Sequence, residues 1–140
     1  MRIAICDDEK TFISDFTAMI SNLYKSLDMI VDQFLSGKAL LDSFLTQPYD
    51  LVFLDIEMPG IDGISLARQL RQQNEDVSIV FVTGHEEYAI KRYGLNALRY
   101  LLKPVSEEEV HVILEYVLKK QNNKKFIWLP NFHFEQRQLL

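Results

Sequence analysis

Five short apolar runs alternate along this chain with longer stretches whose apolar residues repeat at helical spacing. A continuous apolar run is typical of a parallel strand that is buried on both faces, whereas an amphipathic stretch is typical of a helix lying on the sheet. We expect strands at residues 2–6, 29–35, 51–54, 77–82 and 98–102. With right-handed crossovers, this order predicts an α/β fold, a doubly wound five-stranded parallel sheet with helices on both faces.

The helical stretches differ in the strength of their patterns. Phe12, Phe16, Met19 and Leu23 recur at spacings of four and three residues, which places them on one helix face. Residues 37–45 and 63–71 carry shorter versions of this pattern, and residues 88–93 a weaker one. The last helix has the clearest start, because Ser106 and Glu109 fit a capping box. Its predicted apolar face is Val110, Ile113, Leu114, Val117 and Leu118.

Composition sets limits on the kind of protein. A chain of 140 residues with 48% hydrophobic and 25% charged residues is typical of one globular domain. A formal charge of -5, with scattered Lys and Arg, argues against DNA binding by these residues. The single cysteine, Cys6, lies in an apolar run, so we interpret it as a core residue. Without a signal peptide, a membrane span or an internal disulfide, the sequence predicts a cytoplasmic protein with no membrane contact.

The C-terminal segment departs from this pattern. The polar and basic run at 121–125 is expected to be a linker, and residues 126–134, FIWLPNFHF, are strongly apolar and aromatic. This tail is open to three interpretations: the first strand of a second domain, a segment that packs on this domain, or an oligomer contact. We therefore predict a domain over 1–121, followed over 122–140 by a linker and an apolar tail.

Polar residues gather where the predicted strands end. In a doubly wound sheet, ligands bind outside the carboxyl ends of the strands, so these ends are the positions to inspect. They carry Asp7, Asp8, Glu9, Asp55, Thr83 and Lys103. Each alone has an ordinary structural interpretation as a cap, a turn hydroxyl or a solvated charge. Their placement on one edge indicates a site.

The chemistry of these side chains indicates phosphoryl transfer. Asp7, Asp8 and Asp55 would repel one another unless a cation lay between them, and oxygen ligands with phosphate favour Mg²⁺. A rigidly held Asp55 is then a nucleophile for phosphorus. Thr83 is suited to donate a hydrogen bond to one phosphoryl oxygen, and Lys103 to neutralise another.

The motifs ICDDE, LDIEMPGIDG, FVTG and YLLKP, in this order, resemble the receiver domain of two-component response regulators over residues 1 to about 121. The resemblance implies a flavodoxin-like sheet of order 2-1-3-4-5. It implies that Asp55 is the phosphoacceptor for a sensor histidine kinase. Asp7 and Asp8 would bind Mg²⁺ together with Asp55 and the backbone carbonyl of Glu57.

Other roles come with the same resemblance. Thr83 and Lys103 would contact the phosphoryl group, Thr83 and Tyr100 would form the switch, and the Lys103–Pro104 peptide bond would be cis. The domain would be a regulatory phosphoprotein and not an enzyme, apart from self-phosphorylation and slow self-dephosphorylation. Apart from the resemblance, we expect phosphorylation to favour a homodimer. The face formed by the fourth predicted helix and the fifth strand carries aromatic and basic groups able to pair with a second copy, namely Tyr88, Lys91, Arg92 and Arg99.

The stretch EEYAIKRYGLNALRYLLKP is similar to the LytTR-type subgroup, whose receivers usually precede a β-rich DNA-binding domain. This similarity implies transcription regulation. We expect DNA binding only through a C-terminal effector domain that is absent from these 140 residues, with the tail as a candidate for its start.

Two alternatives remain. A haloacid-dehalogenase-like phosphatase also combines an Asp nucleophile with Thr, Lys and an acidic pair, and Glu57 follows Asp55 by two residues. That family, however, places its nucleophile near the N-terminus and the acidic pair late. A receiver-like binding module without phosphorylation would normally have lost one of the site residues, and none is lost. His85, His111 and His133 show no metal-ligand spacing.

Overall fold

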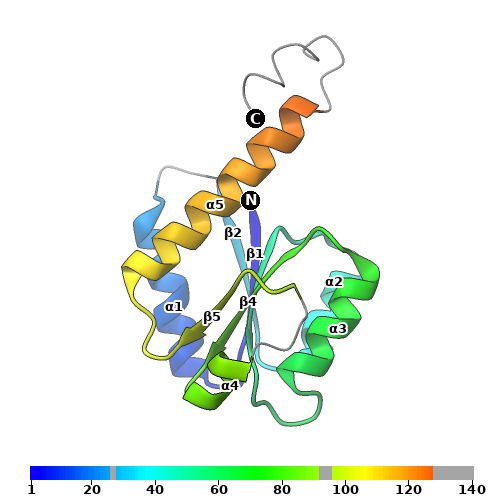
Figure 1. Cartoon of the computed structure of the whole chain (residues 1–140), viewed down its shortest axis with the longest axis vertical. Helices are drawn as coiled ribbons and strands as arrows, with labels where there is room; N and C mark the ends of the chain where they lie inside the picture. Colours follow the sequence, from blue (N-terminus) through cyan, green and yellow to red (C-terminus); the bar gives the residue numbers. More distant parts are fainter. Residues whose placement is uncertain (26–27, 92–95, 128–140) are drawn as a thin grey trace.

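A five-stranded parallel sheet forms the centre of the computed structural model, which describes residues 1–25, 28–91 and 96–127 (Figure 1). The strands are β1 (Arg2–Cys6), β2 (Ile30–Phe34), β3 (Leu51–Asp55), β4 (Ser78–Thr83) and β5 (Arg99–Leu102). The helices are α1 (Lys10–Leu23), α2 (Gly37–Phe44), α3 (Gly63–Gln73), α4 (Glu86–Lys91) and α5 (Glu107–Ile127). The strand order is β2-β1-β3-β4-β5 and every pairing is parallel, which confirms the predicted fold.

Helices cover both faces of the sheet. Figure 1 shows α1 and α5 on one side and α2 and α3 on the other. In β3, Leu51 and Phe53 contribute to the core under α1 and α5, whereas Val52 and Leu54 contribute to the core under α2 and α3. Because successive side chains of a strand point to opposite faces, both sets must be apolar. The continuous apolar run in the sequence therefore follows from burial on two sides.

The buried face of α1 is broader than its predicted stripe. Ile13, Phe16 and Ile20 are the buried residues of this helix. Phe12, Met19 and Leu23 are only partly buried and pack at the margin of the same core. Of the four predicted residues, only Phe16 lies at the centre of the face.

The start of α5 is as predicted, but its end is not. The Ser106 N–H donates to Glu109 Oε1 at 3.2 Å and the Glu109 N–H donates to Ser106 Oγ at 3.2 Å, which is a capping box. The predicted linker at 121–125 is helical, because α5 continues to Ile127. Lys and Gln are good helix formers, and positive charge is favourable near a helix C-terminus. The apolar tail from residue 128 lies outside the described residues.

The short helix α4 begins earlier than the pattern at 88–93 predicts, and residues 92 and 93 lie outside the described residues. Its Tyr88 packs against the core on the α2 and α3 side. None of the helices in the described ranges is long and apolar enough to cross a membrane.

Candidate functional site

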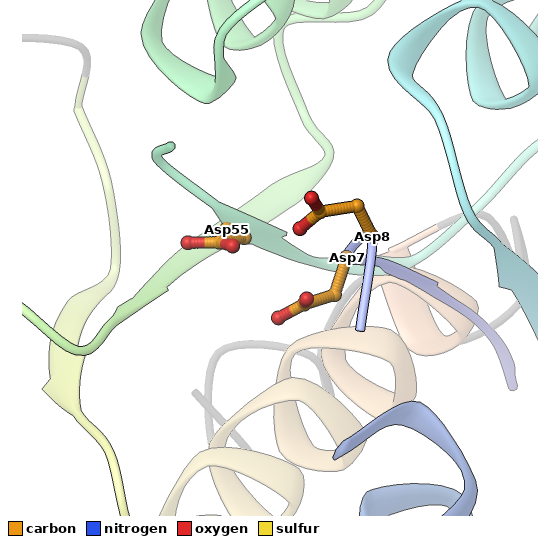
Figure 2. Close-up of side chains that lie close together, drawn as sticks. All are labelled: Asp7, Asp8 and Asp55. Carbon is orange, nitrogen blue, oxygen red and sulfur yellow. The ribbon is translucent and has the colours of Figure 1, made fainter. Parts of the chain in front are cut away.

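Three carboxylates meet at the carboxyl edge of the sheet (Figure 2). Asp7 and Asp8 follow β1, and Asp55 is the last residue of β3. Since β1 and β3 are neighbours in the sheet, residues far apart in the sequence come together, and one ligand atom of each lies within 4.8 Å of the others. Asp7 and Asp55 are buried and Asp8 is exposed, so the cluster opens to solvent on the side of Asp8.

Asp55 occupies an unfavourable place for a charge. Its residue surface is 7% exposed, and it follows four buried apolar residues of β3. Burial is the largest cause that raises the pKa of Asp55 to about 6, and the charge of Asp7 adds to it. The Lys103 ammonium and a hydrogen bond from the Glu57 backbone act in the opposite direction. Asp55 is thus ionised at neutral pH, with a carboxylate that is weakly solvated.

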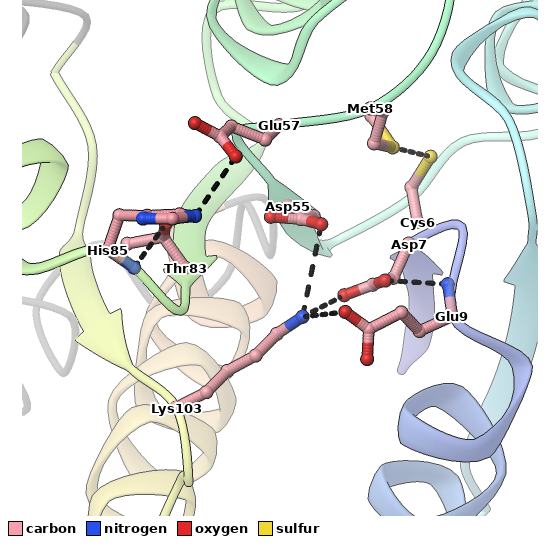
Figure 3. Close-up of polar contacts among 9 residues, drawn as sticks. All are labelled: Cys6, Asp7, Glu9, Asp55, Glu57, Met58, Thr83, His85 and Lys103. Atoms are coloured by element: carbon pink, nitrogen blue, oxygen red, sulfur yellow. Dashed lines mark hydrogen bonds and ion pairs between the residues drawn. The ribbon is translucent and has the colours of Figure 1, made fainter.

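Lys103 links the acidic residues (Figure 3). Its Nζ donates to Asp7 Oδ2 at 2.8 Å and lies 3.9 Å from Asp55 Oδ2. Burial lowers the pKa of Lys103, but the hydrogen bond to Asp7 and the negative charges of Asp55, Asp7 and Glu9 outweigh burial and raise it. The ammonium therefore stays charged beside the Asp55 carboxylate. The Lys103–Pro104 peptide bond is cis.

Thr83 lies at the end of β4 and is fully buried. Its Oγ1 accepts a hydrogen bond of 3.1 Å from the His85 N–H, and its carbonyl accepts one of 2.8 Å from the Lys103 N–H. The second bond joins the ends of β4 and β5. A hydroxyl that accepts a hydrogen bond still has its own proton to donate, so Thr83 keeps a donor for a ligand at this edge.

Tyr100 of β5 is half-buried, and its ring stacks on Phe81 of β4 with 5.3 Å between centroids. This contact joins the predicted switch aromatic to the strand that ends in Thr83.

The side chain of Glu57 forms a bridge that the sequence does not predict, since the resemblance implies a role only for its backbone carbonyl. Glu57 Oε2 lies 3.0 Å from His85 Nε2, and Glu57 Oε1 accepts a 2.7 Å hydrogen bond from the Tyr88 hydroxyl. The bridge connects the loop after β3 with the start of α4 (Figure 3 shows its His85 arm). No spacing rule relates these residues, since only the sheet order brings the two loops together.

Two contacts of Lys103 were not predicted, one with Glu9, which the sequence places at this edge, and one with Phe12. Glu9 Oε1 lies 3.8 Å from Nζ, and Nζ lies over the ring of Phe12 at 4.3 Å from its centroid. In the sequence Phe12 is one member of an apolar stripe, and nothing in that stripe indicates a lysine beside it.

The donor set of the acidic cluster fits magnesium. Its members are carboxylates, and hard oxygen donors with room for water and phosphate are the ligands that Mg²⁺ prefers. Across the described part of the chain, no other three His, Cys, Asp or Glu side chains gather in this way. Cys6, next to Asp7, is a buried core residue as predicted, and burial raises the pKa of its thiol to about 12.

Comparison with known proteins now decides the family. Residues 3–115 match the family model of the response regulator receiver domain. The chain belongs to this family. It is a receiver domain of a two-component response regulator, and the phosphatase alternative is set aside.

Relatives of known sequence and structure agree with this family. The receiver is 36% identical over 106 residues to an uncharacterized response regulatory protein of Vibrio cholerae, covering 76% of this chain and 40% of the relative. It is 28% identical to the sensory transduction protein LytT of Bacillus subtilis, covering 99% of this chain and 56% of that protein. The chain spans about half the length of these curated relatives. The crystal structure of the response regulatory domain of protein mrkE from Klebsiella pneumoniae superposes with a TM-score of 0.74 at 28% identity, covering 86% of this chain and 97% of that one.

Proposed function

We propose that this receiver accepts a phosphoryl group on Asp55 from a sensor histidine kinase in a magnesium-dependent reaction. The observation that supports the proposal is the arrangement at the sheet edge. The buried Asp55 carboxylate lies with Asp7 and Asp8 within 4.8 Å, and Lys103 Nζ lies 3.9 Å from Asp55 Oδ2. A buried carboxylate suited to act as nucleophile, oxygen donors suited to a cation and a compensating ammonium thus lie together, which supports the proposal.

The chain's own residues perform the transfer in a simple sequence. An oxygen of Asp55 attacks phosphorus, and the bond between phosphorus and the donor histidine nitrogen breaks, with its electron pair leaving on that nitrogen. Burial at the end of β3 fixes the direction of the carboxylate, and with a pKa of about 6 the group is still mostly ionised at neutral pH. The Lys103 ammonium stabilises negative charge on a phosphoryl oxygen.

Asp7, Asp8 and Asp55, with the Glu57 backbone carbonyl, would hold Mg²⁺, which would shield the approach of the anionic phosphoryl group to the carboxylates.

The switch follows from the placement of Thr83 and Tyr100. The Thr83 hydroxyl donates to a phosphoryl oxygen, and its shift towards that oxygen leaves space for Tyr100 to turn inward from its stack on Phe81. Such a change shifts an equilibrium between two existing conformations of the receiver. The size of the shift depends on how much more favourably the phosphoryl group interacts with one conformation than with the other.

The output that we propose is transcription control through a LytTR-type DNA-binding domain outside these 140 residues, in a cytoplasmic protein. The similarity to LytT and to the transcriptional regulatory protein LytR of Staphylococcus aureus supports this output. In this proposal the receiver covers residues 1–121, and the segment over 122–140 connects it to the effector domain. The helical continuation of α5 to Ile127 makes the first part of that connection stiff.

Labelling by acetyl phosphate tests the proposal. With magnesium, the unaltered protein should gain one acid-labile phosphoryl group, and Asp55→Asn should gain none while keeping its fold. Asp15→Asn, on the exposed side of α1, is the matched control and should label normally. Equal labelling of Asp55→Asn would contradict the assignment of the acceptor. No labelling of the unaltered protein would favour a receiver-like module that binds partners without phosphorylation.

A further inference from the structure

The ammonium of Lys103 is held from more than one side. Asp7 Oδ2 lies 2.8 Å from Nζ, Glu9 Oε1 lies 3.8 Å away and Asp55 Oδ2 lies 3.9 Å away. The face of the Phe12 ring lies under Nζ, at 4.3 Å from the ring centroid. The side chain of Lys103 is 16% exposed, so solvent screens these interactions only in part. Phe12 is thus the aromatic member of the group that surrounds Nζ.

The ring of Phe12 is itself anchored to the acceptor strand. Its centroid lies 5.3 Å from that of Phe16, and Phe16 meets Phe53 of β3 edge-on at 4.8 Å. Phe53 and Asp55 are two residues apart on β3, so their side chains leave the same face of the sheet. A row of three aromatic rings therefore connects the strand that ends in Asp55 with the ring under the Lys103 ammonium.

An aromatic face attracts a cation differently from a carboxylate. The ring quadrupole favours the position of the ammonium over the ring without adding a negative charge. A further carboxylate in this place would compete with the phosphoryl oxygens for Nζ, and an aliphatic side chain would not attract it. A flexible lysine side chain loses conformational entropy when its ammonium is held in one place. If the Phe12 ring already holds the ammonium before the reaction, less of this entropy is lost on the way to the transition state.

We propose that Phe12 is a positioning residue for phosphoryl transfer, which holds the Lys103 ammonium at the acceptor side of the site through a cation–π contact. The inference rests on the proposed function, since it concerns the same reaction at Asp55. It assigns to Phe12 a role beyond its place in the core of α1.

A graded substitution separates this role from packing. Fluorination of the Phe12 ring with one, two and three fluorine atoms weakens its attraction for cations while nearly preserving its shape. The rate constant of labelling by acetyl phosphate should fall stepwise with each fluorine, by about three- to tenfold over the series. Phe12→Leu should be as slow as the trifluorinated protein, and Phe12→Trp should recover most of the rate. Stability measured by urea unfolding should not follow this order.

The matched control is the same fluorination at Phe34, which is partly buried and packs against the core on the opposite face. Labelling should not change there. A second readout needs neither metal nor phosphoryl donor: the ε-methylene protons of Lys103 should show an upfield ring-current shift in the NMR spectrum, and Phe12→Leu should remove it.

The outcomes distinguish this inference from the proposed function. Labelling that is equal in the unaltered, fluorinated and Phe12→Leu proteins would overturn the role of Phe12 alone. Absence of the ring-current shift would overturn the contact itself. Absence of any labelling in the unaltered protein would overturn the proposed function. The role of Phe12 in that reaction would then be overturned as well.

Discussion

At the scale of single residues, the site is a balance of unfavourable and compensating charges. Asp55 is nearly buried and close to Asp7, and both features raise the free energy of its ionised form. Lys103 and the Glu57 backbone offset this only in part, since the pKa of Asp55 remains at about 6. The folded protein is therefore destabilised at neutral pH by the residue that the proposed reaction needs.

This balance predicts a pH dependence of stability. The pKa of Asp55 has its ordinary value near 3.8 in the unfolded chain and about 6 in the folded protein. Between these pH values the folded protein binds more protons than the unfolded chain. The contribution of Asp55 to the free energy of unfolding therefore falls as pH rises from about 4 to about 6. Without divalent cations, Asp55→Asn should raise the free energy of unfolding by about 1–3 kcal/mol above pH 7. The gain should vanish below pH 4. Urea unfolding at several pH values is the measurement, and a gain that does not vary with pH would contradict the cause.

The acidic neighbours allow a second prediction at this scale. Asp8→Ala should reduce both Mg²⁺ affinity and labelling by acetyl phosphate, because it removes one oxygen ligand of the cluster. Asp15→Ala, exposed on α1, removes the same charge elsewhere and should change neither by more than about twofold, as expected for exposed charges. Calorimetric titration measures the affinity. A double variant lacking both Asp7 and Asp8 with unchanged affinity would place Mg²⁺ elsewhere.

At the scale of elements, the start of α3 is fitted tightly to the end of β3. The Gly63 N–H donates to the Ile56 carbonyl at 2.8 Å, and a Cβ on Gly63 would overlap the Asp55 carbonyl oxygen and lie 2.8 Å from Ile56 Cα. Asp62 caps the same helix by accepting from the Ser65 N–H at 2.8 Å. The close approach of two backbones fixes the position of the acceptor, and only glycine permits it.

Gly63→Ala should therefore lower the free energy of unfolding by about 1–3 kcal/mol. The added methyl group would meet backbone atoms, which cannot move aside as a flexible side chain can. Gly84 is the matched control, because a Cβ there has no heavy atom within 4 Å. Gly84→Ala should change stability by no more than about 0.5 kcal/mol. Thermal and urea unfolding of the two variants make the comparison, and equal effects would show that the contact at Gly63 is not tight.

At the scale of the whole molecule, the proposed switch at Thr83 and Tyr100 has to reach a surface. Tyr100 connects Phe81 of β4 with the face formed by α4 and β5, where Leu102 is 41% exposed. A conformational coupling of about 1–3 kcal/mol is typical of such switches, which corresponds to a change of roughly 5- to 150-fold in association. An apolar side chain on an edge strand is suited to contact with a second copy.

We predict that beryllofluoride with magnesium, as a mimic of the phosphoryl group, promotes homodimerisation. Tyr100→Ala should weaken this association without preventing modification of Asp55, because the Tyr100 ring stacks on Phe81, whereas the proposed transfer uses Asp55, Lys103 and the acidic cluster. Sedimentation at several protein concentrations measures the association constant. A constant that is unchanged in a sample shown to have bound the mimic would mean that another segment or protein reads the switch.

The sequence by itself determined the strand and helix order, the two-sided core and the residues at the strand ends, because hydrophobic period and strand polarity are local properties. Five apolar runs in a βα order place Asp7, Asp55, Thr83 and Lys103 on one edge whatever the packing details. The capping box at Ser106 was visible for the same local reason.

Only the tertiary structure decided which side chains meet. The Glu57–His85 and Glu57–Tyr88 contacts depend on two loops that the sheet order brings together. The Phe12 ring reaches Lys103 because α1 and the residues around the end of β5 contribute to the core on the same side of the sheet. Residues 121–125 are also helical, where their polar pattern predicts a linker. Contacts between distant segments depend on the relative placement of whole elements, which no local spacing encodes, and they set the pKa of Asp55 and the position of its ammonium partner.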